Sequence, residues 1–170
     1  MSQITLTPMT KALAREYYRE FIPDPDLFLD KSRYKPYIYS PEHSDARVER
    51  YEALGRIFLA VMLEDKPVGE IVLKNIDREA MCCTMGISLV NDTYKNKGLG
   101  TAAERLILKY AFEQLNMQTV FADVVITNER SRHVLEKVGF RETHRSDTFV
   151  YYRCDRNHWM AQSAKYALDL

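Results

Sequence analysis

The stretch that decides the fold is Lys95-Asn96-Lys97-Gly98-Leu99-Gly100-Thr101. We expect a helix to begin at Gly98, and the first turn of a helix leaves its backbone N–H groups unpaired and carries a partial positive charge. Two glycines let the main chain approach an anion without obstruction by side chains. The stretch therefore predicts a phosphate-binding turn. The alternative is an ordinary helix start beside a flexible turn with two solvated lysines.

The segments on either side of this turn predict a β-α-β unit. A strand is expected at residues 81–90, ahead of a polar loop, and the helix runs from Gly98 to about residue 114. A strongly β-branched strand follows at 119–126, and an amphipathic helix at 128–138 ends at Gly139. The apolar residues of the first helix follow helical spacing and predict one buried face: Leu99, Ala103, Leu106, Ile107, Tyr110 and Ala111.

The rest of the chain predicts further strands, which short connections join in antiparallel order. Strands are expected at residues 4–9, 57–63, 68–75, 140–144 and 148–155, and helices at 11–21, 26–31, 41–54 and from 156 onward. The fold class is therefore α+β (mixed α/β), with a mostly antiparallel sheet that holds one parallel strand pair and is flanked by helices. A chain of 170 residues predicts a single domain over residues 1–170.

Composition narrows the function further. Lys and Arg total 24, as do Asp and Glu, and this balance argues against nucleic acid as the main partner. Three cysteines without zinc spacing predict reduced thiols and no metal site. No apolar run has the roughly 20 residues of a membrane helix, and the N-terminus has no signal-peptide core. We therefore expect a cytoplasmic protein without a membrane partner.

A dinucleotide-binding module is the main alternative for the glycine turn, because Gly98 to Ala103 satisfies Gly-x-Gly-x-x-Ala. In that fold the glycines follow the strand directly. Here seven residues, 91–97, separate Val90 from Gly98, and Asp123 lies inside the next strand instead of at its end. Both features argue against this alternative.

Two motifs resemble those of the GCN5-related N-acetyltransferase (GNAT) superfamily. Its Gln/Arg-x-x-Gly-x-Gly/Ala motif is matched by Lys95, Gly98 and Gly100, with Lys95 in place of the usual Gln or Arg. Downstream, Asn128-Glu129-Arg130-Ser131 and then Glu136-Lys137-Val138-Gly139-Phe140 are similar to the family's "N-x-x-S, then E-K-x-G-F". The resemblance covers residues 68–155, and within the superfamily the chain looks most like the RimJ/RimL-type ribosomal-protein alanine N-acetyltransferases.

The resemblance implies acetyl-CoA as cosubstrate and assigns its contacts by position. Main-chain groups of Ser88, Leu89 and Val90 would meet the acetyl group and pantetheine arm, and Asn128 would hydrogen-bond the arm. The parallel strands would splay apart to admit it. The pyrophosphate would bind the N–H groups of the turn, at Lys95, Asn96, Lys97, Gly98, Leu99, Gly100 and Thr101.

The implied reaction is direct attack of a primary amine on the thioester in a ternary complex. The amine must lose a proton, the oxyanion needs a donor, which the family places at a backbone N–H near Val90, and the thiolate benefits from a proton. The family's usual proton donor, a Tyr seven residues after the Asn, is Leu135 here. Ser131 is the nearest replacement for it and also a candidate contact of the cofactor, or else an ordinary polar residue near a helix cap.

Two carboxylates are candidates for the base. Asp123 lies five residues before Asn128, where some family members carry an acid, but it could instead be a structural carboxylate paired with Arg or Lys. Glu70 is its rival, with the alternative of an outward-facing strand residue. Transfer through waters without a dedicated base is a third route.

The acceptor stays open at this stage: a protein N-terminus, a lysine, a polyamine, an amino sugar or another small amine. Homodimers are common in the family, but the sequence carries no clear signature of one. A non-catalytic acetyl-CoA sensor is the second hypothesis, because the usual Tyr is missing and Lys95 replaces Gln or Arg.

Overall fold

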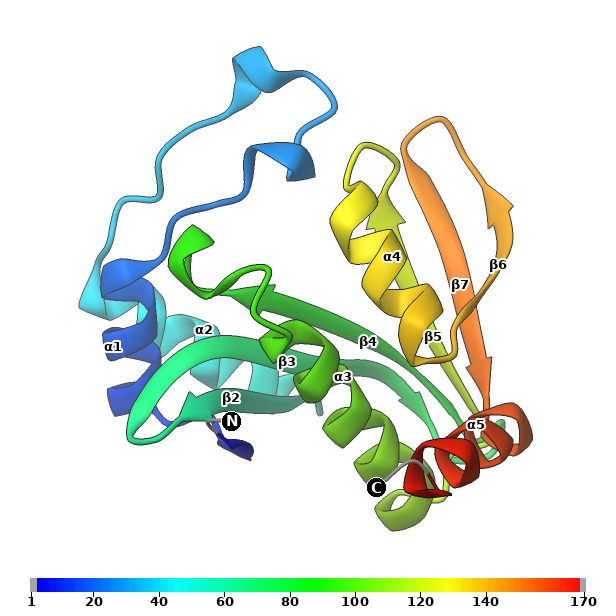
Figure 1. Cartoon of the computed structure of the whole chain (residues 1–170). Coiled ribbons are helices and arrows are strands. Elements are labelled where there is room, and N and C mark those ends of the chain that lie inside the picture. Colours follow the sequence, from blue (N-terminus) through cyan, green and yellow to red (C-terminus); the bar gives the residue numbers. More distant parts are fainter. Residues whose placement is uncertain (1–2, 169–170) are drawn as a thin grey trace.

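A seven-stranded sheet forms the centre of the computed structural model, which describes residues 3–168 (Figure 1). The strand order is β1-β2-β3-β4-β5-β7-β6. All neighbours pair antiparallel except β4 and β5, which are parallel, as the sequence predicted. The strands are β1 (Ile4–Pro8), β2 (Ile57–Leu63), β3 (Lys66–Asp77), β4 (Cys82–Leu89), β5 (Thr119–Val125), β6 (Arg141–Arg145) and β7 (Phe149–Asp155).

Helices cover the sheet on both faces. On one face α1 (Lys11–Glu20) and α2 (Pro41–Ala53) pack against each other and against β2 and β3. On the other face α3 (Leu99–Lys109), α4 (Glu129–Val138) and α5 (Arg156–Leu168) enclose the larger hydrophobic core. No helix within residues 3–168 combines the length and apolar character needed to cross a membrane.

Local sequence signals fix several helix ends. The Thr10 side chain accepts a hydrogen bond from the Leu13 N–H, and Ser40 accepts one from His43 with Pro41 at the first helical position. Gly139 takes a left-handed conformation with φ of 114° and ends α4, as predicted.

Two expectations about helices were wrong. Residues 26–31 form no helix of their own, and two short 3₁₀ turns, Pro25–Leu27 and Lys31–Arg33, occur in this region. The helix after Gly98 reaches residue 114 as expected, but α3 itself ends at Lys109 and the continuation is a π-helical turn, in which the Leu115 N–H bonds the Tyr110 carbonyl at 3.1 Å. Leu106 was expected in the core but is 38% exposed, because it faces a surface groove described below.

The sheet opens between its two parallel strands (Figure 1). Pairing of β4 with β5 covers three residue pairs and ends at Thr84 and Phe121. Beyond that point β4 stays paired with β3 as far as Leu89, and β5 stays paired with β7 as far as Val125. The splayed pair that the resemblance implied is therefore present, and it leaves main-chain groups of two strands without a ladder partner.

Candidate active site

A pocket of about 160 Å³ lies where β4 and β5 diverge. The end of β4, the first turns of α3 and α4, and the loop before α3 contribute its walls. The structure brings six of the predicted cofactor residues together in this pocket: Ser88, Leu89, Lys95, Gly100, Asn128 and Ser131.

The N-terminus of α3 lies beside this pocket without a side-chain cap. Gly98 is its N-cap in the left-handed conformation with φ of +76°, and within the described residues no side chain caps this helix start. A Cβ atom added at Gly98 or at Gly100 would meet nothing within 4 Å. The glycine turn therefore leaves space next to the first turn of α3, where helix N–H groups lack partners within the helix, as an anion site requires.

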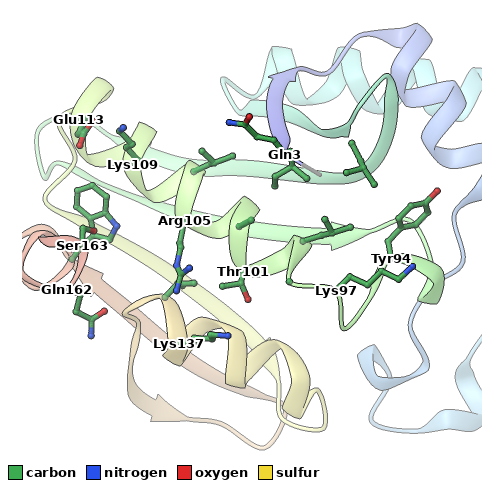
Figure 2. A pocket seen from close by; sticks show the side chains of 18 residues that line it. Gln3, Tyr94, Lys97, Thr101, Arg105, Lys109, Glu113, Lys137, Gln162 and Ser163 are labelled. Atoms are coloured by element: carbon green, nitrogen blue, oxygen red, sulfur yellow. The ribbon is translucent and has the colours of Figure 1, made fainter. Parts of the chain in front are cut away.

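A larger groove of about 1040 Å³ lies on the other side of the same helix start (Figure 2). Gly98, Leu99 and Thr101 line it, so the two hollows meet at the glycine turn. Figure 2 shows Arg105 extending from α3 toward α4, which carries Lys137. The cationic side chains in the wall outnumber the single carboxylate of Glu113 and favour an anionic ligand: Lys97, Arg105, Lys109 and Lys137.

The charge of Lys95 is already balanced. Its Nζ lies 2.6 Å from an Asp24 carboxylate oxygen and 2.7 Å from one of Asp92, and the lysine side chain is 10% exposed. Burial opposes ionisation of Asp24, but hydrogen bonds from Lys95 and from the Asp26 N–H outweigh it and lower the Asp24 pKa. Arg130 lies 4.0 Å from the same carboxylate. The sequence pattern did not reveal that Asp24 pairs with Lys95, because 71 residues separate the two.

Main-chain hydrogen bonds at the end of β4 leave the Leu89 N–H as the candidate hydrogen-bond donor for the oxyanion. The Val90 N–H donates to the Val68 carbonyl at 2.9 Å, and the Ser88 carbonyl accepts from the Tyr17 hydroxyl at 3.2 Å. Successive residues of a strand direct their N–H and C=O groups to opposite sides, so Leu89 directs its own toward the gap beside β5. The N–H of Val90 itself is occupied.

The start of α4 supplies polar groups to the pocket. The Asn128 side-chain oxygen accepts a hydrogen bond from the Ser131 N–H at 3.2 Å and thereby caps the helix. Its amide NH₂ is the group left for a ligand. Leu135, which occupies the position of the family's usual Tyr, is 1% exposed in the core.

Glu70 does not face outward, so that alternative was wrong. The residue is 8% exposed on the side of the sheet that α1 and α2 cover, and it pairs with Ser88 across β3 and β4. Its carboxylate accepts hydrogen bonds from the Tyr18 hydroxyl and from Arg47 Nη2, the latter at 3.1 Å. Burial raises the pKa of Glu70, and the charge of Arg47 partly offsets this.

Asp123 does not line the 160 Å³ pocket, and it points to the face of the sheet opposite to its buried neighbours Ala122 and Val124. It is exposed on β5, opposite Tyr151 of β7, and has no ion pair within the described part of the chain. The structural pairing with Arg or Lys that the sequence left open is therefore absent, and an exposed carboxylate needs none.

Glu104 of α3 is a pocket residue that the sequence pattern did not single out. It is 2% exposed and lines the pocket between β4 and α4. Burial raises its pKa to about 8, so its carboxyl group is largely neutral at pH 7. The sequence did hold a signal for its burial: Glu104 lies four residues after Gly100 and four before Leu108, so all three share one face of the helix.

Comparison with known proteins identifies the family. The family model described as "Acetyltransferase (GNAT) domain" matches residues 3–141. The chain therefore belongs to the GNAT acetyltransferase family. The Bacillus subtilis (strain 168) protein "Putative ribosomal N-acetyltransferase YdaF" is 30% identical over 102 residues, which are 60% of this chain and 55% of that protein. This similarity supports the RimJ/RimL-like group.

Solved structures share the fold at low sequence identity. "Apo FdhC- a nucleotide-linked sugar GNAT" superposes with a TM-score of 0.79 at 14% identity, covering 98% of this chain and 94% of that one. A spermidine N-acetyltransferase from Vibrio cholerae in complex with CoA and spermine gives a TM-score of 0.75 at 16% identity, with 94% and 99% covered. In sequence, the chain spans about half the length of the curated relatives it matches.

Proposed function

We propose that this protein is an N-acetyltransferase that moves the acetyl group of acetyl-CoA to a primary amine. One observation carries the proposal: an uncapped helix start with two glycines opens directly onto the gap between two splayed parallel strands. Phosphate groups fit the helix start, and an extended arm with amide groups fits the gap between the strands.

The two hollows match the two halves of coenzyme A. The pyrophosphate would lie at the N–H groups of Gly98 to Thr101, where the hollows meet. The pantetheine arm would extend into the 160 Å³ pocket along Leu89 and Asn128. The phosphorylated adenosine would occupy the larger groove, where the cationic side chains favour its charge.

The reaction needs an oxyanion donor and a route for the amine. With the thioester beside the end of β4, the Leu89 N–H is the backbone donor that no strand ladder uses. The amine would approach from the face that α1 and α2 flank, where Tyr17 bonds the Ser88 carbonyl. The amine nitrogen then forms its bond to the acetyl carbon, and the electron pair of the broken C–S bond leaves with sulfur.

Glu70 and Asp123 both belong to this acceptor side of the sheet, and either could take the ammonium proton. Burial favours Glu70 because it raises the pKa toward the working range of a base, whereas Arg47 and Tyr18 hold the carboxylate in place. Asp123 is exposed and without an ion pair among the described residues. Ser131 in the pocket is the hydroxyl that could protonate the departing thiolate.

The acceptor is proposed as a primary amine on a soluble molecule or a protein N-terminus. The names of similar proteins span ribosomal, spermidine and sugar-linked substrates, which leaves the class of amine to experiment. Acetyl-CoA binding without release of free thiol in a screen of polyamines, amino sugars and peptide N-termini would favour the sensor hypothesis instead.

The replacement Gly100→Leu tests the cofactor site. A Cβ atom at this position meets nothing within 4 Å in the unliganded protein, so the fold should persist, but the leucine side chain would fill the space that the pyrophosphate needs. We expect the Kd of acetyl-CoA, measured by isothermal titration calorimetry, to rise roughly 100-fold, equivalent to about 2.7 kcal/mol. Ala53→Leu is the matched control, because it places the same leucine side chain at an exposed position at the far end of α2.

If Gly100→Leu and the wild type bind acetyl-CoA with equal affinity, the glycine turn is not part of the cofactor site. No binding of acetyl-CoA by the wild-type protein would overturn the proposed function as a whole. Titration with NAD in parallel checks the dinucleotide alternative.

Asp24→Asn should strengthen acetyl-CoA binding. Asp24 neutralises Lys95 inside the pocket, and both side chains are largely buried. Removing this carboxylate leaves Lys95 paired only with the exposed Asp92, so more of its charge can act on the cofactor phosphates. We expect the Kd to fall about threefold to tenfold at low ionic strength, and the gain to shrink as added salt screens the charge. Titrations at low and at high salt measure both effects. An unchanged or weaker affinity would show that Asp24 does not compete with the phosphates.

A further inference from the structure

The residues described in the structure include two buried glutamates, and they differ in one respect. Glu70 receives hydrogen bonds from Tyr18 and Arg47, which satisfy its carboxylate. Glu104 is 2% exposed, and its Oε2 is buried without a hydrogen-bond partner among residues 3–168. A buried polar atom without a partner is rare in folded proteins and requires an explanation.

The position of Glu104 explains why its carboxyl oxygen has no partner in the unliganded protein. It lies one helical turn after Gly100, so about 6 Å further along the α3 axis from the proposed pyrophosphate site. It lines the same pocket as Ser88 of β4 and Ser131 of α4. An arm that starts at the pyrophosphate and extends toward the end of β4 would therefore pass this carboxyl group.

No charged group in the pocket pairs with Glu104. Lys95 from the loop before α3 is held by Asp24 and Asp92, and Arg130 of α4 is directed to Asp24. Burial accounts for the raised pKa of about 8. At neutral pH the carboxyl group is therefore mostly protonated and offers an O–H donor.

We propose that Glu104 donates a hydrogen bond from its neutral carboxyl group to an amide carbonyl of the pantetheine arm. The inference rests on the proposed function, because it takes acetyl-CoA as the ligand. A neutral acid suits this pocket, since a carboxylate there would repel the carbonyl oxygens and the pyrophosphate. Acetyl-CoA binding is then strong while Glu104 is protonated and weakens as the pH rises through its pKa.

Titration calorimetry with acetyl-CoA between pH 6.5 and pH 9.5 at constant ionic strength tests this. For the wild type we expect the Kd to rise roughly tenfold between pH 7 and pH 9, since one proton is tied to binding. Glu104→Gln keeps a donor that does not ionise, so its Kd should match the wild type at pH 7 and stay constant. Glu104→Leu loses the donor, and its Kd should be roughly tenfold higher at pH 7 and independent of pH.

Glu52→Gln serves as the matched control, because it removes an exposed carboxylate from α2 and should keep the wild-type pH profile. Circular dichroism of every variant verifies that the fold is retained. Identical profiles for the wild type and Glu104→Gln would overturn the inference, as would tighter wild-type binding at high pH, which indicates a carboxylate acceptor. If the wild type fails to bind at every pH, the proposed function itself is refuted.

Discussion

Replacing Glu104 with leucine is expected to raise the free energy of unfolding, and to raise it more at pH 8 than at pH 5. The folded protein holds the Glu104 proton up to a pKa of about 8, whereas the unfolded chain releases it near the ordinary value of 4.5. Between these values the folded state binds more protons than the unfolded state, so the stability of the wild type falls as the pH rises. Above pH 8 both states are ionised and this dependence ends.

The expected size of the effect is large for one side chain. The slope is about 1.4 kcal/mol per pH unit, so the proton that the folded wild type retains on Glu104 lowers its free energy of unfolding by on the order of 4 kcal/mol between pH 5 and pH 8. Leucine of similar volume removes both the slope and the unpartnered carboxyl group. Urea unfolding of both proteins at pH 5, 6.5 and 8 measures the difference.

Glu104→Gln distinguishes the effect of ionisation from that of burying a polar group. Glutamine does not ionise, so the pH dependence is lost, but a buried polar group remains. Glu70 contributes a slope of the same sign to every variant, since burial raises its pKa as well, and it cancels in the comparison. Parallel stability curves for the wild type and the leucine variant would contradict the prediction.

Arg47→Met is expected to destabilise the fold by about 2–3 kcal/mol at pH 8. The Arg47 guanidinium bonds the buried Glu70 carboxylate at 3.1 Å and lies 5.3 Å from the centre of the Tyr18 ring. Methionine retains much of the packing but leaves the carboxylate without its cation, and an unpaired buried charge is costly. The Arg47 side chain is 40% exposed, so water screens part of the loss.

The pH dependence of this loss identifies its cause. Without Arg47 the pKa of Glu70 should rise further, so the carboxyl group takes up a proton more readily as the pH falls, and the destabilisation should be smaller at pH 5 than at pH 8. Adding Glu70→Gln to Arg47→Met should recover part of the stability at pH 8, which a double-mutant cycle measures. A loss that is equal at pH 5 and pH 8 and not reduced by Glu70→Gln would show that packing, not charge, stabilises this pair.

Much of the fold could be predicted because its signals are local. Short connections indicated the antiparallel strands, and the spacing around Gly98 indicated the helix after the parallel strand β4. Caps at Thr10, Ser40 and Gly139 occur where the sequence placed them. The error at Leu106 has a tertiary cause, because helical spacing identifies an apolar face but not which part of it a neighbouring element covers.

The sequence by itself determined the family, the strand and helix order, and the glycine turn with its neighbouring residues, because these depend on residues adjacent in the chain. Only the tertiary structure decided which charges are paired and which carboxyl groups are buried. Asp24 reaches Lys95 across 71 residues, and Glu70 meets Tyr18 across 52. The burial and pKa of Glu104 likewise depend on α4 and β4 closing around α3. Burial and pairing arise from contacts between distant segments, and no local pattern records them.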